Sequence, residues 1–395
     1  MNSRQTVTFS FSPADYDGEI RTIGVMGTFL FYESGLTGHT CATGMGDNQT
    51  YFNPHQYREG LEFIGMRYYE EMTRGEDGLY RLFFDLPAGM YSYRFAINAV
   101  IEEQLPEFPS KKLMAVCADG RMHGFGLDTV YLPDPKRPPR IPTVTGQQED
   151  SIFFVGDWND YAWLPGAPEK YRGEVHYLSY EDVEGNPQSL GVYLPAGFSR
   201  EKTYPAVFVS HGGGGNEADW FYQGGLDRIM DSLLARGETE PAVLVTMNNS
   251  VYAWDYDKIA ANLYERILPL VRRLFPISGE VARNAFCGLS MGSMTTLVMY
   301  MRHNTAFRYF GAFSGGVAGG KEFTLEDPAL MEKRLFIGCA EEDIAWNERE
   351  IGIPPTLRAL QAKGVPFTQY FVPGGHDWYC WPQMFEEFAK NFLWK

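Results

Sequence analysis

The pentapeptide Gly288-Leu-Ser-Met-Gly292 constrains the fold of this chain more than any other segment. An apolar, β-prone run from Asn284 to Gly288 precedes Ser290, and a helix-prone run from Met291 to His303 follows it. A serine between two glycines at a strand-to-helix junction predicts a nucleophile elbow, a sharp turn that pushes the hydroxyl toward solvent. The glycines are expected because a side chain there would collide with the neighbouring strand or helix. The pattern therefore predicts an α/β fold with Ser290 as nucleophile.

A glycine-rich loop upstream supplies a second feature of acyl-transfer sites. The buried-strand pattern from Tyr204 to Ser210 leads directly into His211 and four consecutive glycines. Backbone N–H groups aimed at the developing oxyanion typically contribute a few kcal/mol to such reactions. The amide after the nucleophile, Met291, is one expected donor, and Gly213 is the other, with Gly212 beside it. A phosphate cradle is disfavoured because no GxxxxGK[ST] pattern follows, whereas a flexible surface loop is the plainer alternative.

A base and an acid are expected on two later loops. His376 follows the strand pattern from Phe367 to Pro373 on a glycine-rich loop, where an imidazole can take the proton of a serine hydroxyl. Asp343 lies beyond the strand pattern from Arg334 to Cys339 and is the candidate acid, which gives the chain order Ser, Asp, His. Three neighbouring carboxylates compete with it, namely Glu341, Glu342 and Asp377.

Composition limits the possible partners. The net charge of −16 disfavours nucleic acid and anionic membrane surfaces as binding partners. The sequence also holds no basic cluster that could bind them. The first residues lack an apolar stretch of signal-peptide length, and no apolar run is long enough to cross a bilayer, so we expect a soluble, cytoplasmic protein. The five cysteines show no CxxC spacing, which favours free buried thiols. No metal-binding pattern occurs, and no cofactor is expected.

The chain of 395 residues is long enough for two domains. The proline-rich, charged segment from Asp134 to Pro142 is the expected linker, so the predicted domains are residues 1–142 and 143–395. Aromatic, β-branched runs at 78–85 and 90–97, joined by a hairpin-like turn at 86–89, predict a small antiparallel sandwich before the linker.

After the linker, strand and helix patterns alternate. The clearest helix spans Lys258 to Leu274, and a final helix is expected around Met384 to Leu393. Alternation of this kind predicts a mostly parallel sheet flanked by helices, with the site at the carboxyl ends of the strands. Strands are expected at 174–180, 189–194, 204–210, 242–247, 285–288, 310–313, 335–339 and 368–372.

Several spaced motifs resemble a known family. HGGGGNEADW, MNNS at 247–250, GLSMGS, GAFSGG at 311–316 and GGHDW are similar to the esterase D-like branch of the α/β-hydrolases. That branch includes the feruloyl and acetylxylan esterases of carbohydrate esterase family 1 and the enterobactin esterases. The resemblance implies the same triad and oxyanion donors as above. The chain departs from it at Ser293, where many members carry glycine, and only local repacking is expected.

The segment before the linker resembles the immunoglobulin-like domain, similar to family 48 carbohydrate-binding modules, that precedes some of these esterases. Such a domain implies either contact with a glycan or a role at the esterase entrance. A non-catalytic carbohydrate-binding protein is therefore one alternative reading of the chain. It depends on aromatic side chains in the front strands, namely Tyr80, Phe83, Tyr91, Tyr93 and Phe95.

Four tryptophans accompany the expected catalytic loops. Trp220, Trp254, Trp346 and Trp378 are candidate substrate contacts, because planar acyl groups stack on indole rings, although each could simply pack its own loop. The sequence thus favours a serine carboxylesterase that releases ferulate or p-coumarate from arabinoxylan oligosaccharides. Enterobactin hydrolysis is an alternative that would call for several Lys or Arg side chains, and acetylxylan hydrolysis is another. The oligomeric state stays open.

Overall fold

The computed structural model describes most of the chain as two compact units. The first unit contains the described residues up to 136 and those at 151–155, and the second contains those from 166 onward. The described residues are 5–27, 31–33, 61–63, 70–86, 89–99, 101–103, 114–116, 122–125, 129–136, 151–155, 166–213, 215–252, 254–317, 323–341, 343, 345–346, 348, 351–372, 376, 378 and 380–395.

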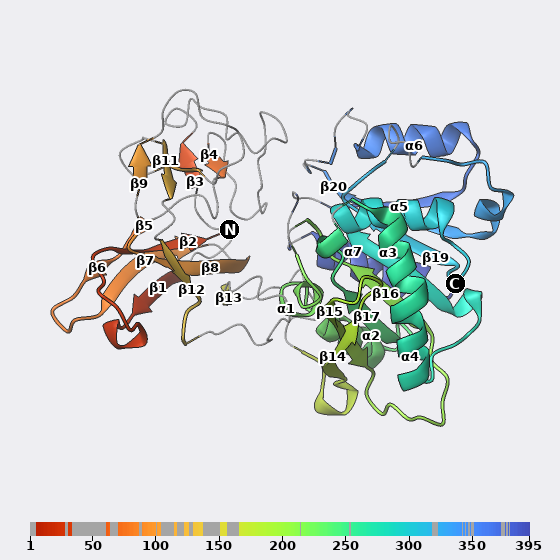
Figure 1. The fold of residues 1–395 in the computed structure, drawn as a ribbon, viewed down its shortest axis with the longest axis horizontal. Helices are drawn as coiled ribbons and strands as arrows, with labels where there is room; N and C mark the ends of the chain where they lie inside the picture. The colour runs from red at the N-terminus through yellow and green to blue at the C-terminus, as the bar shows by residue number, and fades with distance from the viewer. Residues whose placement is uncertain are drawn as a thin grey trace. The chain divides into compact units, whose positions relative to one another are not determined.

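The first unit is built from antiparallel sheets (Figure 1). One sheet has the order β1 (Gln5–Phe11), β7 (Tyr80–Leu86), β6 (Thr73–Arg74). A second has the order β12 (Val130–Leu132), β8 (Gly89–Ile97), β2 (Ile23–Gly27), β5 (Glu70–Glu71), and β13 (Ser151–Val155) also pairs with β8. Smaller sheets pair β3 (Phe31–Glu33) with β4 (Leu61–Phe63), and β11 (Met122–Phe125) with β10 (Met114–Val116) and β9 (Ile101–Glu103).

The two larger sheets share an aromatic core. Phe9 of β1 meets Tyr93 of β8 at 4.9 Å and Phe153 of β13 at 5.5 Å between ring centroids, and Phe11 meets Phe95 at 5.0 Å. Tyr93 and Phe95 are fully buried, so they build core and offer no face to a glycan. The antiparallel character predicted for this region is confirmed. The closer likeness to an immunoglobulin-like module stays a prediction.

Two details of the first unit differ from the sequence prediction. β7 and β8 do not form a hairpin, because β7 pairs with β1 and β6 whereas β8 pairs with β2, β12 and β13. Consecutive strands of a sandwich often change sheets in this way, and the two aromatic runs alone cannot reveal it. The central turn residues Pro87 and Ala88 lie outside the described residues. The pairing of β13 also places residues 151–155 in the first unit, beyond the expected linker.

The second unit contains one eight-stranded sheet. Its first two strands are antiparallel to their neighbours and the other six run parallel, as the alternating pattern predicts. The spatial order is β14 (Glu174–Glu181), β15 (Pro187–Leu194), β17 (Val243–Met247), β16 (Ala206–Ser210), β18 (Asn284–Leu289), β19 (Tyr309–Phe313), β20 (Arg334–Ala340) and β21 (Phe367–Val372).

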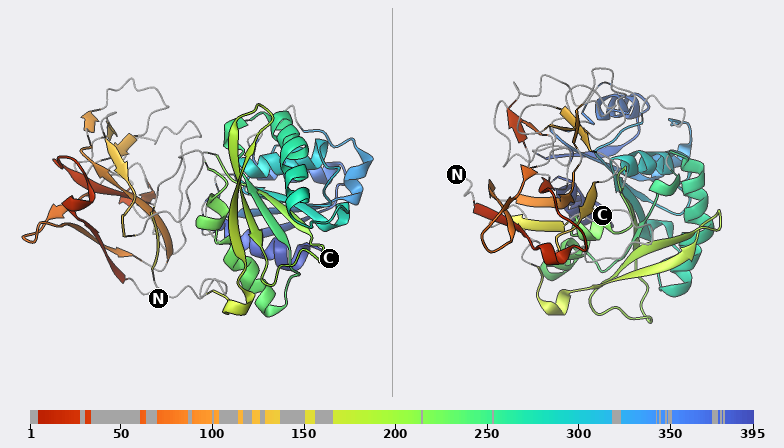
Figure 2. Two further views of the ribbon diagram at one scale, coloured as in Figure 1. Left: turned by 60° about the horizontal axis from the view of Figure 1, so that its bottom comes forward. Right: turned by 60° about the vertical axis from the view of Figure 1, so that its left-hand side comes forward.

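Helices cover both faces of this sheet (Figures 1 and 2). α3, α4 and α5 pack on the face that carries Phe208, Phe286 and Phe310. α7 lies on the opposite face, where Phe388, the residue directly after it, meets Phe313. This division follows from the alternation of side chains along each strand. The helices are α1 (Asp219–Tyr222), α2 (Leu226–Arg236), α3 (Tyr256–Asn262), α4 (Leu268–Leu274), α5 (Met291–Arg302), α6 (Ile353–Ala362) and α7 (Trp381–Glu387).

The helix predicted from Lys258 to Leu274 is interrupted by a π turn at Leu263–Ile267. Pro269 lies in the first turn of α4 and has no N–H, so the regular i to i−4 hydrogen bond is lost there. Leu268 instead donates to the carbonyl of Leu263. The predicted C-terminal helix likewise continues from α7 into a π turn at Phe388–Phe392.

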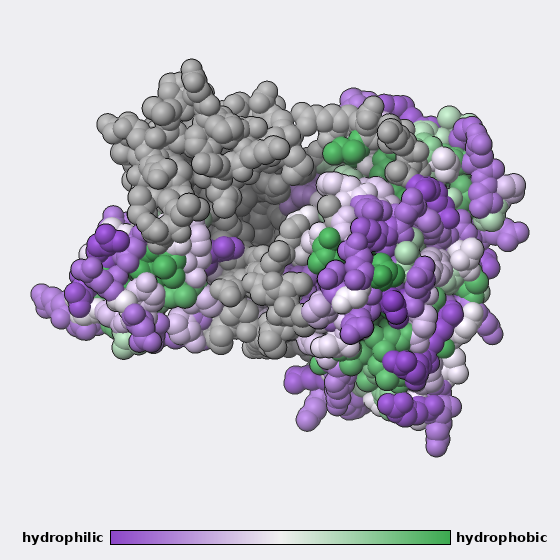
Figure 3. Space-filling view, viewed as in Figure 1, coloured by the Kyte–Doolittle hydropathy of each residue, from purple (hydrophilic) through white to green (hydrophobic). Residues whose placement is uncertain are grey.

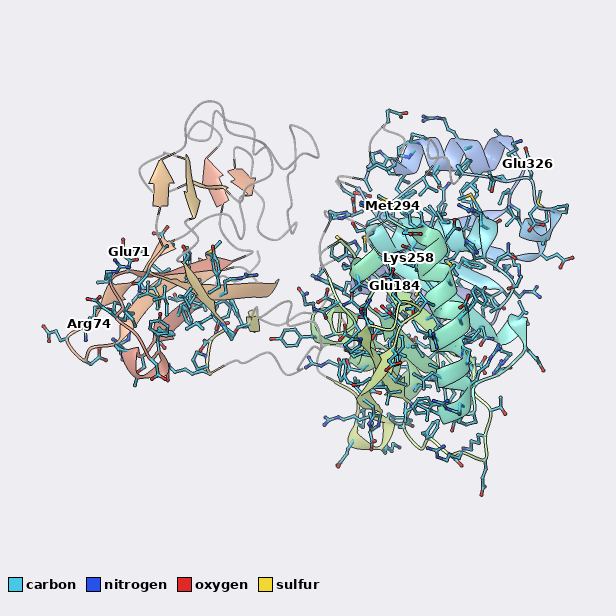
Figure 4. All side chains as sticks on the ribbon, in the orientation of Figure 1. Glu71, Arg74, Glu184, Lys258, Met294 and Glu326 are labelled. Atoms are coloured by element: carbon cyan, nitrogen blue, oxygen red, sulfur yellow. The ribbon has the colours of Figure 1, made fainter. Side chains whose placement is uncertain are left out.

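The described surface of the second unit is mostly polar in the view of Figure 3, with smaller apolar patches between the polar side chains. One ion pair joins the turn after β14 to the first turn of α3, where the Lys258 ammonium lies 2.8 Å from a Glu184 carboxylate oxygen (Figure 4). Among the described residues no helix is both long and apolar enough to cross a membrane. Cys287 and Cys339 are free and buried, and Cys380 is also buried, whereas Cys41 and Cys117 lie outside the described residues.

Phe307 packs against residues of three strands that lead to the site. Its buried ring meets Phe208 of β16 at 5.5 Å, Phe286 of β18 at 5.7 Å and Phe310 of β19 at 6.2 Å. Truncation to alanine opens a cavity that this packed face can only partly fill. Phe307→Ala is therefore expected to lower the free energy of unfolding by about 3 to 5 kcal/mol.

Denaturant unfolding of the full chain measures this loss. Met331→Ala is the matched control, since Met331 is 53% exposed and its truncation creates no cavity. Equal losses in the two variants would contradict the role assigned to Phe307.

Candidate active site

Ser290 occupies a strained turn between β18 and α5. Its backbone has φ 53° and ψ −115°, a conformation that non-glycine residues rarely adopt, and its N–H donates to the carbonyl of Phe313 at 2.8 Å. A Cβ at Gly288 would lie 2.7 Å from the carbonyl oxygens of Ser210 and Gly292, and one at Gly292 would lie 2.6 Å from those of Ser210 and His211. The two glycines thus let β16, β18 and α5 touch backbone to backbone.

The imidazole of His376 joins the two other candidates of the triad. Its Nε2 lies 2.9 Å from Ser290 Oγ, and its Nδ1 lies 2.8 Å from Asp343 Oδ1. The side chain of His376 is 10% exposed and that of Asp343 is fully buried. These distances correspond to hydrogen bonds from Ser290 to the imidazole and from the imidazole to the carboxylate. The structure therefore brings together three residues that the sequence separates widely.

Asp343 is held as a carboxylate by its surroundings. Burial of the group opposes ionisation, but the nearby His376, the Ser314 hydroxyl and the Ala345 N–H outweigh burial and lower its pKa. The Ala345 N–H donates to Asp343 Oδ1 at 2.7 Å. Glu341, one alternative acid, is exposed, and Glu342 and Asp377 lie outside the described residues.

The glycine-rich loop adjoins the nucleophile. A Cβ at Gly212 would lie 2.7 Å from Leu289 Cδ1 and 3.3 Å from Ser290 Cβ, whereas one at Gly213 would meet nothing within 4 Å. Gly213 is exposed, and Met291 begins α5 directly after the nucleophile. Within the described part of the chain, neither the Gly213 amide nor the Met291 amide donates to a protein acceptor. The oxyanion role of Gly213, Met291 and Gly212 stays a prediction.

His211 holds this loop, a role that the sequence did not reveal. Its Nδ1 donates to the Gly212 carbonyl at 2.6 Å, and its Nε2 accepts from the Asn249 N–H at 3.0 Å. The Ser250 hydroxyl donates to the Gly215 carbonyl at 3.0 Å, so the MNNS segment fastens both ends of the loop. Burial lowers the pKa of His211 from 6.5 to about 4. The loop therefore depends on a neutral imidazole.

Ser293, where the family resemblance predicts glycine, is fully buried in α5. Its hydroxyl donates to the carbonyl of Gly315 at 2.8 Å, which satisfies both polar groups. A Cβ at Gly315 would lie 3.1 Å from the Ser293 Cβ and 2.7 Å from the Ser290 carbonyl oxygen. The departure from glycine is thus accommodated locally, beside the elbow.

The four tryptophans proposed as substrate contacts fall into two groups. Trp220 is 1% exposed, and its indole N–H donates to the Ser210 carbonyl at 3.0 Å. The prediction that this side chain contacts the substrate is therefore wrong. Trp378 is half-buried against Trp220. Trp254 and Trp346 are 58% and 43% exposed and offer indole surface to solvent.

Trp381 was missed by the sequence reasoning. It is 7% exposed, and its indole ring lies 5.0 Å from the His376 imidazole between centroids. Its place five residues after the base was the available signal. No group of three or more His, Cys, Asp or Glu side chains suited to a metal ion occurs among the described residues.

Comparison with known proteins agrees with this geometry. Residues 184–350 match the sequence model of the Esterase family. The endo-1,4-beta-xylanase/feruloyl esterase of Xylanibacter ruminicola is 29% identical over 243 residues, which cover 56% of this chain and 32% of that protein. This chain therefore spans about a third of the length of that curated relative.

Two solved structures are similar in fold. A ferulic acid esterase aligns with a TM-score of 0.51 and 23% identity, covering 56% of this chain and 98% of its own. The enterobactin esterase of Shigella flexneri aligns with a TM-score of 0.55 and 15% identity, covering 100% of this chain and 94% of its own. The sheet, the elbow and these likenesses give the second unit an α/β-hydrolase fold. In sequence it is similar to the Esterase family over residues 184–350 and to a relative whose name includes feruloyl esterase.

The neutral His211 makes stability depend on pH. Below pH 6.5 the imidazole of His211 binds a proton in the unfolded chain but not in the folded loop. The contribution of neutral His211 to the free energy of unfolding is therefore complete above that pH and is lost as the pH falls toward about 4. The full loss is on the order of 3 kcal/mol. His211→Gln is expected to weaken this acid dependence of the unfolding free energy between pH 7 and 5.

Urea unfolding across that range tests the expectation. His176→Gln serves as the control, because His176 is an exposed imidazole beside Glu174 and its removal leaves the buried loop intact. An unchanged acid slope in His211→Gln would show that the loop histidine is not the group responsible.

Proposed function

We propose that this chain is a serine carboxylesterase that uses Ser290, His376 and Asp343. The carrying observation is the imidazole of His376, which bridges Ser290 Oγ at 2.9 Å and Asp343 Oδ1 at 2.8 Å. A structural histidine would need neither a serine at a strained elbow nor a buried carboxylate on its other nitrogen. The match to the Esterase family supports the same reaction class.

The geometry accounts for each step of ester hydrolysis. Ser290 Oγ attacks the carbonyl carbon while its proton passes to His376 Nε2, and the carbonyl electron pair moves onto oxygen. The amides of Gly213 and Met291, with Gly212 beside them, stabilise that oxyanion. As the tetrahedral species collapses, His376 returns the proton to the leaving alcohol, and an acyl-enzyme remains. Water, deprotonated by His376, then attacks the acyl carbonyl and releases the acid.

Asp343 acts through the imidazole. Its carboxylate fixes the tautomer with a proton on Nδ1, so that Nε2 is free to accept from Ser290, and it stabilises the imidazolium that forms. The depressed pKa of Asp343 keeps it charged for this role.

We propose hydroxycinnamate esters of arabinoxylan oligosaccharides as the substrate class. The support is the relative from Xylanibacter ruminicola, whose name includes feruloyl esterase, and the exposed indoles of Trp254 and Trp346. Planar aromatic acyl groups or sugar rings can stack on such surfaces. Glycan contact by the first unit would require exposed aromatic side chains there, and Phe83 is 60% exposed.

Enterobactin hydrolysis is the second candidate. The observation that favours it is the likeness to the Shigella flexneri enterobactin esterase, which covers both units of this chain. Against it, the described residues of the loops that surround the triad carry no Lys or Arg to bind a polyanionic siderophore.

Covalent labelling tests the reaction class. A fluorophosphonate probe is expected to modify the wild-type protein and to leave Ser290→Ala unlabelled, because the probe requires an activated serine. Ser293→Ala is the matched control, since its hydroxyl faces Gly315 and should not react. Mass spectrometry locates the adduct, and labelling that persists in Ser290→Ala would refute the assignment.

Product release tests the substrate class. Initial rates with methyl ferulate are expected to exceed those with acetylated xylan and with an enterobactin trilactone, as measured by chromatography of the released acids. Acetate release alone would replace the feruloyl proposal with an acetylxylan esterase. Faster opening of the trilactone would favour the siderophore esterase instead.

A further inference from the structure

Four rings form a continuous row that ends at the catalytic imidazole. The centroid distances are 5.3 Å from Trp220 to Trp378, 5.1 Å from Trp378 to Trp381 and 5.0 Å from Trp381 to His376. The interplanar angles are 89°, 90° and 88° in the same order, so each ring stands edge-to-face on the next. Such contacts are a favoured geometry for aromatic pairs. We call these four rings the indole row.

The far end of the indole row is anchored beside the nucleophile and the oxyanion loop. The Trp220 indole N–H donates to the carbonyl of Ser210, the last residue of β16 before His211. Trp220 also packs on Phe313 at 6.2 Å, and the Phe313 carbonyl accepts the hydrogen bond from the Ser290 N–H. The row therefore begins on the backbone that positions the elbow.

The middle of the indole row needs a glycine. A Cβ at Gly224 would lie 2.9 Å from the Trp220 ring, 2.9 Å from the Trp378 ring and 2.6 Å from the Trp220 carbonyl oxygen. Only a residue without a side chain leaves room for the two indoles to meet at this point. The contact is thus built into the backbone of the turn before α2.

The near end of the indole row supports the base. Trp381 is buried in the first turn of α7, and its ring contacts an imidazole whose two nitrogens already have partners. Hydrogen bonds to Ser290 and Asp343 fix the two nitrogens of the imidazole but leave rotation of the ring about the line between them. The perpendicular indole of Trp381 limits that rotation. A displacement of about 1 Å at such a site can cost about a hundredfold in rate.

We propose that the indole row is a positioning device for the catalytic base, with Trp381 as the residue that sets the orientation of His376. This inference rests on the proposed esterase reaction. It assigns Trp220 and Trp378 a role in aligning base and nucleophile instead of binding substrate. Trp381 is a positioning residue, because it acts through His376, whose two nitrogens are hydrogen-bonded to Ser290 and Asp343.

Kinetics of ring substitutions test the proposal. Trp381→Leu is expected to lower kcat for methyl ferulate by about tenfold to a hundredfold with KM within about twofold, whereas Trp381→Phe keeps a ring and retains most of kcat. The loss should be smaller with p-nitrophenyl acetate, whose leaving group needs no proton from His376. Trp394→Leu is the matched control, because Trp394 packs on Tyr309 and touches no part of the indole row. Unchanged kcat in a folded Trp381→Leu variant would overturn the proposal.

A spectroscopic measurement tests the same contact without relying on activity. In 15N-labelled protein the indole N–H resonance of Trp381, assigned by its loss in Trp381→Phe, is expected to shift in His376→Gln, because the imidazole ring stands against the indole. The indole resonance of Trp394 should not move, since Trp394 packs on Tyr309. An unchanged Trp381 resonance in His376→Gln would overturn the proposed contact. A wild-type protein without esterase activity would refute the proposed function, and the resonance comparison would then decide the contact alone.

Discussion

The backbone crossing beneath Ser290 is the constraint on which the rest of the second unit depends. Gly288 and Gly292 allow β16, β18 and α5 to approach to distances that would exclude any Cβ. That approach forces the positive φ of Ser290, and the hydrogen bond from its N–H to Phe313 helps to hold it. Strain of this kind persists only where the surroundings determine the conformation from several sides. The sheet, the helix and the glycine-rich loop at 211–215 supply those sides.

Much of this arrangement was predictable because it is local. The elbow, the glycine loop and the order Ser290, Asp343, His376 follow from short motifs that end strands, and parallel strands bring their carboxyl ends to one edge. Of the carboxylates weighed for the acid, Asp343 is the one whose hydrogen bond to the imidazole the structure describes. Residue type and spacing are sufficient where the backbone itself creates the site.

The sequence predictions failed where contacts with distant segments determine the structure. Trp220 lies on a site-forming loop, yet its direction depends on Phe313 and on a carbonyl of β16, neither of which its own segment reveals. The hairpin expected between β7 and β8 failed because sheet membership is settled by the partners of each strand. The π turn before Pro269 depends on one missing N–H within an otherwise regular apolar pattern. The hydrogen bonds by which His211 holds the glycine-rich loop could not be predicted, because they depend on where the MNNS segment lies in the fold.

The absence of side chains at the crossing of β16, β18 and α5 has a consequence for divergence within such enzymes. Backbone packed on backbone leaves no space for compensating substitutions, so this part of the molecule tolerates almost no drift. The loops that follow the strands carry no such restriction and can lengthen, shorten or exchange aromatic groups freely. New ester preferences can therefore arise in these loops while the backbone around Ser290 stays unchanged.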